Sequence, residues 1–247
     1  MPRALNVNDL PLGRSRVGET GARAPGISAS AFTPESEPIS PAATPVATYR
    51  SWKRALDITL GGALAACVLP LFLVSAAAIK VVDGGPAIFW QRRVGRRGRE
   101  FWFPKLRSMH VGAEELHDAL RHHSDHGDSI TFKMREDPRV TGIGRLIRTL
   151  SIDELPQLWC VLKGEMSLVG PRPPLPSEVR RYTPTQLRRL EVQPGITGLW
   201  QVCGRSTIPF DGQIALDVEY IGRQSLRFDL VILARTVRAI LSCKGAW

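Results

Sequence analysis

The longest apolar segment of the chain, residues 58–79, contains no charged side chain. As a straight helix it would extend about 33 Å at ~1.5 Å per residue, enough to cross the ~30 Å hydrocarbon core of a bilayer. Pro70 lies near its middle, where a proline removes one backbone hydrogen bond and kinks the helix axis. The pattern therefore predicts either one transmembrane span or a membrane helix that breaks at Pro70.

Basic residues flank both ends of this segment. Lys53 and Arg54 precede it, and Lys80 and a run of arginines in residues 92–99 follow it. Because the cytoplasmic ends of membrane segments collect Lys and Arg, both ends are expected on the same side of the membrane. We therefore favour a re-entrant helix that enters the bilayer, breaks at Pro70 and returns, with a single span as the alternative.

Two short segments, 87–94 and 99–106, flank a turn bounded by glycines and predict a small β-hairpin. Three aromatic side chains of this hairpin, those of Trp90, Phe101 and Trp102, suit either the membrane interface or the protein core.

Near the C-terminus, residues 226–241 predict an amphipathic helix. Apolar residues recur at intervals of three and four positions, and arginines fall on another face. Docking on the core and lying on the membrane surface both fit this pattern. The apolar stripe consists of Leu226, Leu230, Leu233, Val237 and Ile240.

The formal net charge of +10 implies an anionic partner, such as nucleic acid, a membrane surface or a phosphorylated substrate. Residues 50–107 hold eleven Lys or Arg against three Asp or Glu, beside the most apolar stretch. This distribution favours lipid headgroups, and no nucleic-acid-binding motif is evident. The cysteines stand singly, without metal-ligand or redox spacing, which is typical of a reduced environment facing the cytosol. They are Cys67, Cys160, Cys203 and Cys243.

A tract rich in His and Asp, residues 117–128, raises the question of a metal site. Its histidine spacing matches no known ligand pattern, so we interpret the tract as a solvated loop. The histidines concerned are His117, His122, His123 and His126.

The sequence Ser-Ile-Asp-Glu-Leu-Pro at residues 151–156 places two adjacent carboxylates at a predicted helix start. With Ser151 as the N-cap, Pro156 would fall inside the helix and break a bond. With Asp153 as the N-cap, Pro156 falls in the first turn, where proline is tolerated. The helix dipole would then favour an ionised Asp153 and attract a phosphate. Carboxylates of this kind suit binding a divalent cation or attacking a phosphorus atom.

Basic residues on either side of these carboxylates predict an anion clamp, because arginine binds phosphate oxygens in a bidentate manner. Arg172 stands between two prolines, so its backbone is stiff. An ordinary surface helix that begins with Asp-Glu is the alternative. The clamp residues are Arg145, Arg148, Lys163 and Arg172.

On several ordered motifs, residues 50–247 resemble the bacterial sugar transferase family of monotopic phosphoglycosyl transferases. The motifs are Lys53-Arg54 with Asp57, FPKLRSM at 103–109, DPRVT at 137–141, LIR at 146–148, SIDELPQ at 151–157, MSLVGPRP at 166–173 and PGITG at 194–198.

The resemblance implies a two-step reaction at the bacterial inner membrane, with the catalytic domain facing the cytoplasm. Asp153 would attack the phosphate of a UDP-sugar with Mg²⁺ present, release UMP and form a covalent phospho-sugar intermediate. Polyprenyl phosphate would then accept the phospho-sugar. Glu154 would support metal binding, with Asp153, or the second step. Arg148, Arg172 and Lys105 match positions that contact substrate phosphates.

Residues 198–205 and 215–217 are similar to the exopolysaccharide branch of the family, which transfers galactose- or glucose-phosphate. A structural loop and helix is the alternative interpretation of these residues. The resemblance also implies bilayer lipids and other glycan-assembly enzymes as partners, and it leaves a homodimer open.

The sequence therefore predicts a mixed α and β fold that is mostly helical. Residues 1–50, with seven prolines, predict a disordered tail. The proline-broken re-entrant helix is assigned to 51–82, and a cytosolic catalytic domain with a small hairpin and interfacial amphipathic helices to 83–247. A membrane-anchored binding protein and a single-span enzyme of another type are the competing hypotheses. The binding-protein hypothesis explains the charge but gives no reason for Asp153-Glu154 beside Arg148 and Arg172.

Overall fold

The computed structural model of the chain describes residues 46–113, 134 and 137–242. Helices dominate it, and two small sheets of two strands each complete a mixed α and β fold. This composition confirms the fold class predicted from the sequence. The tail before residue 46 and the His-rich tract at 117–128 lie outside the described residues.

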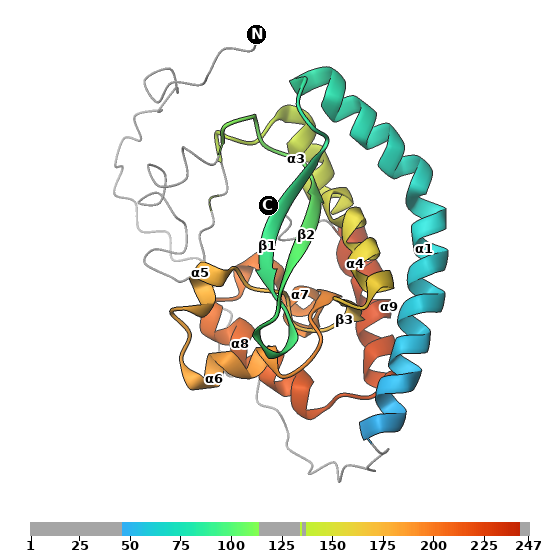
Figure 1. Cartoon of the computed structure of the whole chain (residues 1–247), viewed down its shortest axis with the longest axis vertical. Helices are drawn as coiled ribbons and strands as arrows, with labels where there is room; N and C mark the ends of the chain where they lie inside the picture. Colours follow the sequence, from blue (N-terminus) through green and yellow to red (C-terminus); the bar gives the residue numbers. More distant parts are fainter. Residues whose placement is uncertain (1–45, 114–133, 135–136, 243–247) are drawn as a thin grey trace.

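The first helix, α1 (Val46–Asp83), forms one side of the molecule (Figure 1). It begins within the segment assigned to the tail, and its helical hydrogen bonding continues past Pro70. The expected break and return at Pro70 are therefore not seen; instead the axis of α1 bends along its length (Figure 1). A proline removes one hydrogen bond and tilts the axis, while the neighbouring turns keep their own bonds.

Most apolar side chains in the second half of α1 are exposed. Among the described residues, α1 is the one helix long and apolar enough to cross a membrane, and only 11% of its most apolar window is buried. An apolar surface of this extent in a folded protein marks an interaction with a membrane or another protein. The exposed residues include Leu69, Leu71, Leu73, Val74, Val81 and Val82.

The predicted hairpin is confirmed. Strands β1 (Ile88–Val94) and β2 (Glu100–Leu106) pair in antiparallel register, with Ile88 opposite Leu106. Phe101 points into the core, whereas Trp90 and Trp102 are about half exposed on the other face. The three aromatic residues therefore divide between the two environments that the sequence left open.

The remaining elements build the body behind the hairpin. The short strands β3 (Ser167–Val169) and β4 (Gly195–Thr197) are parallel. The helices are α3 (Gly142–Thr149), η5 (Ile152–Gln157, a 3₁₀ helix), α4 (Leu158–Lys163), α5 (Pro176–Val179), α6 (Pro184–Leu187), η6 (Arg188–Leu190, 3₁₀), α7 (Leu199–Cys203), η7 (Arg205–Thr207, 3₁₀), α8 (Phe210–Gly222) and α9 (Leu226–Ser242).

The core lies where β2, α4, β3, α8 and α9 meet. Its fully or nearly fully buried members include Phe103, Val161, Val169, Tyr220 and Ile232. Apolar side chains of α1, among them Val68, pack against its edge. The core thus joins the membrane-type helix to the rest of the chain.

Helix α9 confirms the predicted amphipathic segment. Ile232 and Asp229 are completely buried, whereas Leu230 and Val237 from the predicted stripe are 52% and 60% exposed. Another member of the stripe, Leu233, packs against the core, so the stripe is divided between the two environments that the sequence left open. Helix α9 therefore presents apolar side chains both to the core and outward.

Asp229 is buried because it pairs with α1. Lys53 donates to the Asp229 carboxylate at 2.8 Å, and the hydroxyls of Tyr49 and Tyr220 donate to the same carboxylate at 2.9 and 2.8 Å. Lys53 also donates to the carbonyl of Val169 in β3 at 2.9 Å. The cation that was counted as a membrane-flanking charge is therefore part of a buried ion pair.

Two more residues of α1 bind the body of the protein. Asp57 accepts from the Ser167 hydroxyl and the Leu168 N–H, both at 2.9 Å. Arg54 donates to the carbonyls of Val161 and Leu162 at the C-terminal end of α4. Such contacts satisfy carbonyl groups that a helix leaves unpaired. The N-terminal part of α1 is thus an integral part of the folded domain.

We predict that Asp229→Asn destabilises the protein by about 3–5 kcal/mol, because it leaves the buried Lys53 ammonium without a counter-ion. Chemical unfolding of the detergent-solubilised protein measures the change. Glu219→Gln is the matched control, since its ion pair with Arg223 is exposed on α8 and should contribute less than about 1 kcal/mol. Equal, small losses in both variants would contradict the anchoring role of the pair.

Candidate active site

The two central carboxylates lie at the start of η5. Ser151, the residue before η5, adopts a left-handed conformation with φ 57° and ψ 24°, which is costly for a residue other than glycine. The chain turns sharply there, so Asp153 and Glu154 fall in the first turn of η5. The N-cap position predicted for Asp153 is therefore wrong, because the turn at Ser151 starts the helix two residues earlier.

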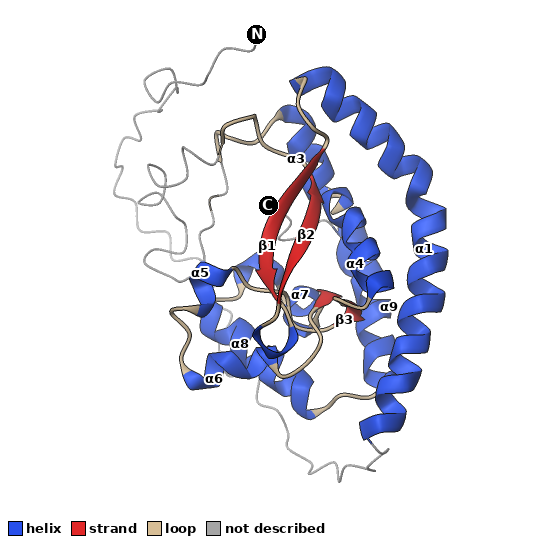
Figure 2. Cartoon of the chain, in the orientation of Figure 1, coloured by secondary structure: helices blue, strands red, loops and turns tan. Residues whose placement is uncertain are grey.

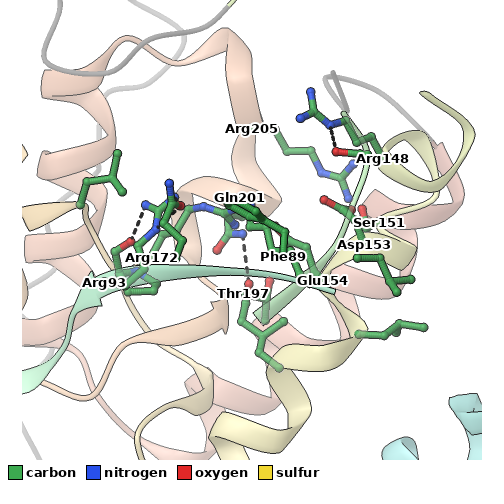
Figure 3. A pocket seen from close by; sticks show the side chains of 18 of the residues that line it. Phe89, Arg93, Arg148, Ser151, Asp153, Glu154, Arg172, Thr197, Gln201 and Arg205 are labelled. Carbon is green, nitrogen blue, oxygen red and sulfur yellow. Dashed lines mark hydrogen bonds and ion pairs between the residues drawn. The ribbon is translucent and has the colours of Figure 1, made fainter. Parts of the chain in front are cut away.

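These carboxylates line a cavity of about 1230 Å³ (Figure 3). Strand β2 packs against η5 and contributes Lys105 to the same cavity. Helix α3 contributes Arg148, and the loop after β3 contributes Arg172. All five residues predicted for the site therefore meet in one cavity.

Arg172 pairs with Glu154, with 2.6 Å between the guanidinium nitrogen and the carboxylate oxygen. The loop that carries Arg172 is held from two sides. Its preceding strand is bound to α1, and Arg93 of β1 donates to the carbonyl of Pro173 at 3.0 Å. The expected stiffness of this loop thus has direct support in its contacts.

Arg148 is positioned by the loop that follows β2. Its Nε donates to the Ser108 hydroxyl at 2.8 Å. The Ser108 carbonyl in turn accepts from the N–H of Thr141, the N-cap of α3, at 3.1 Å. A Cβ on Gly144 would collide with that carbonyl oxygen, so only glycine permits this close approach.

The run DPRVT, residues 137–141, contacts the same region. Asp137 binds the Arg139 guanidinium through both carboxylate oxygens, at 2.8 and 2.6 Å, and both residues are buried. Arg139 also accepts from the N–H of His110 at 3.0 Å through its carbonyl. The run therefore fixes the loop that holds Ser108, and it acts on Arg148 through that contact.

The pKa values of the two carboxyl groups in the site are shifted in opposite directions. Burial raises the pKa of Asp153 above its ordinary value, and the neighbouring Glu154 adds to the rise. Burial acts on Glu154 in the same sense, but Arg172 and Lys105 outweigh it and hold its pKa below the ordinary value. Burial and the nearby Arg172 lower the pKa of Lys105 to about 8.

The raised pKa of Asp153 differs from the sequence-based expectation that a helix start favours the ionised form of this side chain. A 3₁₀ helix as short as η5 has a small dipole, whereas the loss of hydration at a nearly buried carboxylate is large. Desolvation therefore dominates at Asp153.

Two members of the predicted clamp lie elsewhere. Arg145 is exposed on α3, and the Lys163 ammonium sits 5.4 Å from the centre of the Trp159 ring. Neither residue lines the cavity. On a helix, residues three positions apart are displaced by about 60° around the axis, so Arg148 can face the cavity while Arg145 faces solvent.

Further basic and polar residues line the cavity, and one of them, Arg93, was counted from the sequence only among the membrane-flanking charges. Arg205 lies at the same end of the cavity as Arg148 and Asp153 (Figure 3), and its charge helps to lower the pKa of Glu154. Its left-handed backbone, φ 51°, is the signal of a constrained position, and sequence does not reveal it. Arg93 and Gln201 also line the cavity.

The C-terminal run that was compared with the exopolysaccharide branch divides into two parts. Trp200, Gln201 and Arg205 line the cavity. Asp217 does not; it forms a buried ion pair with Arg189 at 2.7 Å, between α8 and η6. Burial raises the pKa of Asp217 to about 6, against the opposing effect of Arg189. The ion pair between Asp217 and Arg189 is therefore a structural contact that holds α8 against η6.

The donor set at Asp153 and Glu154 fits a magnesium ion that is shared with a substrate. Within the described ranges, no group of three His, Cys, Asp or Glu side chains could hold a metal by itself. Mg²⁺ is, however, commonly bound by one or two carboxylates together with substrate phosphates. Asp153 and Glu154 are adjacent carboxylates that open onto one cavity, so they meet that requirement.

Comparison with known proteins places this geometry in a family. The family model described as "Bacterial sugar transferase" matches residues 48–243. The chain is 50% identical over 198 residues to the "Galactosyl transferase CpsE" of Streptococcus agalactiae, covering 78% of this chain and 43% of that relative. It therefore spans less than half the length of that relative.

Shorter relatives match over more of their length. The "Exopolysaccharide production protein ExoY" of Rhizobium meliloti is 38% identical over 198 residues, 79% of this chain and 88% of ExoY. The "UDP-glucose:undecaprenyl-phosphate glucose-1-phosphate transferase" of Caulobacter vibrioides is 41% identical over 203 residues, 79% of this chain and 72% of that relative. The chain therefore belongs to the bacterial sugar transferase family, and the cavity that contains Asp153 and Glu154 lies within the matched residues.

Proposed function

We propose that the protein transfers hexose-1-phosphate, galactose or glucose, from a UDP-sugar to undecaprenyl phosphate and releases UMP. The main support for this proposal is that Asp153 and Glu154 line one cavity together with Lys105, Arg148 and Arg172. Nucleotide sugar and lipid phosphate both bring phosphate groups that such cations bind. Two relatives are named "UDP-glucose:undecaprenyl-phosphate glucose-1-phosphate transferase" and "Undecaprenyl-phosphate galactose phosphotransferase", and these names support this substrate class.

The contacts assign different roles to the two carboxylates. Glu154 is held by Arg172 at 2.6 Å, whereas no hydrogen bond from a described residue engages the Asp153 carboxylate. An oxygen that is free of hydrogen bonds, in a site that raises its pKa, is the better nucleophile once ionised. We therefore assign the attack to Asp153 and a supporting role to Glu154.

In the first step, an Asp153 oxygen forms a bond to the sugar-bearing phosphorus of the donor. The bond from that phosphorus to the bridging oxygen breaks, and UMP leaves with the electron pair. In the second step, a phosphate oxygen of the lipid attacks the same phosphorus, and the bond to Asp153 breaks. The carboxylate is regenerated, and the product is a polyprenyl diphosphate sugar.

The basic residues and a metal ion would lower the repulsion in both steps. Arg148 and Arg172, each fixed by one hydrogen bond to the protein, can direct their remaining donors to phosphate oxygens. Lys105 and Arg205 add positive charge. A Mg²⁺ ion held by Asp153 and Glu154 would supply charge neutralisation at the diphosphate.

For the membrane, we infer that the bent but unbroken α1 dips into the bilayer from the cytoplasmic face and that both of its ends lie at that face. Both ends of α1 contact the same folded domain. Near its start, Lys53 pairs with Asp229, and at its end, Asp83 lies 3.8 Å from Arg107 and 3.4 Å from His110. A helix whose ends are both bound to one domain cannot place them on opposite sides, which supports the re-entrant arrangement over a single span. Its exposed apolar middle would lie in the lipid.

A topology measurement tests this inference. Single cysteines replacing Arg50 and Val82, in a background without the native cysteines, should both react with a membrane-impermeant reagent applied to the cytoplasmic side. A cysteine replacing Leu71 is the control and should be protected by lipid. Labelling of the first two positions from opposite sides would exclude the re-entrant arrangement.

Charge removal tests the phosphate-binding role. We expect Arg148→Ala and Arg172→Ala each to lower kcat/KM by about 10- to 150-fold, equivalent to ~1.5–3 kcal/mol for a charged hydrogen bond. Arg145→Ala, on the exposed face of the same helix as Arg148, should retain wild-type activity. Similar activity in all three variants would remove both arginines from the site.

The central experiment concerns Asp153. Asp153→Asn keeps the size of the side chain and removes its charge, so the variant should fold but form no covalent phospho-sugar and release no UMP. Asp211→Asn is the matched control, because Asp211 also lies in the first turn of a helix and is exposed. Wild-type protein incubated with labelled UDP-sugar, without lipid, should carry the label on Asp153 in peptide mass spectrometry. Normal turnover by Asp153→Asn would disprove the covalent mechanism.

A further inference from the structure

The cavity that contains Asp153 extends beyond the charged residues. Its wall continues onto α1, at Leu64 and Val68, and onto α9, at Leu233, Ala239 and Ile240. No charged side chain belongs to this part of the lining. The cavity therefore has a charged portion, at η5, and an apolar portion between the two longest helices.

Two polar side chains in this portion, those of Thr197 and Thr236, are hydrogen-bonded within the protein. Thr236 of α9 donates its hydroxyl to the carbonyl of Ile232 at 2.8 Å, and its oxygen is 2.7 Å from the hydroxyl of Thr197 in β4. Because these hydroxyls are paired within the protein, they present few free donors or acceptors to a ligand. This part of the wall suits an apolar ligand group.

The same two helices carry apolar side chains on their outer faces. Leu71 and Leu73 of α1 are 46% and 56% exposed, and Leu230, Val237 and Leu241 of α9 are 52%, 60% and 79% exposed. The two helices that line the apolar portion thus also expose apolar side chains to their surroundings. A polar nucleotide sugar gains nothing from contact with such side chains.

We propose that the portion between α1 and α9 binds the first isoprenoid units of the lipid acceptor, while its phosphate lies at the cations around Asp153. This inference rests on the proposed function. An amphiphile with an anionic head and an apolar tail matches the two portions of the cavity in both chemistry and order. Its tail leaves the cavity toward the outer faces of α1 and α9.

Filling the apolar portion tests the assignment. Ala239→Trp and Leu64→Trp narrow it from opposite walls. Each should raise the KM for long-chain polyprenyl phosphate about tenfold or more, the effect of losing contact with roughly two methylene groups. The KM for the UDP-sugar, and lipid-independent labelling of Asp153, should not change. Thr185→Trp, at an exposed position of α6 that does not line the cavity, is the matched control and should resemble the wild type.

Chain length provides a second comparison. Methyl phosphate carries no isoprene unit and makes none of these contacts, so the two narrowing variants should use it as well as the wild type does. Photo-crosslinking of the wild type, with a diazirine on the first isoprene unit of the acceptor, should label peptides of α1 and α9. This measurement does not depend on the folding of any variant.

The possible outcomes separate the two proposals. Absence of UMP release and of label on Asp153 in the wild type would refute the proposed function. If the donor reaction proceeds, an unchanged acceptor KM in both narrowing variants would overturn the acceptor site, as would crosslinks outside α1 and α9. A rise in the donor KM instead would assign this portion to the nucleotide sugar.

Discussion

The buried ion pair between Lys53 and Asp229 is the contact on which the arrangement of this protein depends. It joins the start of α1 to α9, and Lys53 also donates to the carbonyl of Val169, the last residue of β3. Three residues later the chain reaches Arg172, which pairs with Glu154. Desolvation makes such a pair costly to assemble and more costly to break. The membrane-type helix and the charged cavity are therefore parts of one packed structure.

Within the cavity, unequal contacts distinguish two chemically identical groups. Glu154 has a partner that lowers its pKa, whereas burial and the Glu154 charge raise the pKa of Asp153. The difference arises because Arg172 donates a hydrogen bond to Glu154, whereas Arg148 donates to the Ser108 hydroxyl. Two adjacent carboxylates can thus take separate roles in a reaction that needs one nucleophile and one support.

The sequence predicted features that depend on local pattern or on a distinctive motif. The hairpin and the C-terminal helix follow from periodicity, and Asp153, Glu154, Lys105, Arg148 and Arg172 follow from the family motifs; all five line the cavity. Their chemical roles stay predictions. Features that depend on tertiary contacts were not predictable. The burial of Lys53 and Asp229 requires a partner far away in sequence, and the left-handed turns at Ser151 and Arg205 have no glycine to announce them. The bend without a break at Pro70 depends on how the flanking turns pack.

The separation of the anchoring pair along the chain has a consequence for biosynthesis. Lys53 and Asp229 are 176 positions apart, so the ribosome synthesises α1 long before α9. During that interval the apolar helix has left the ribosome while its buried lysine has no counter-ion, and contacts of such separation form late because loop closure precedes them. The nascent chain can become a native enzyme only after its last long helix emerges. A product that stops short of α9 lacks the counter-ion for the Lys53 ammonium beside the core.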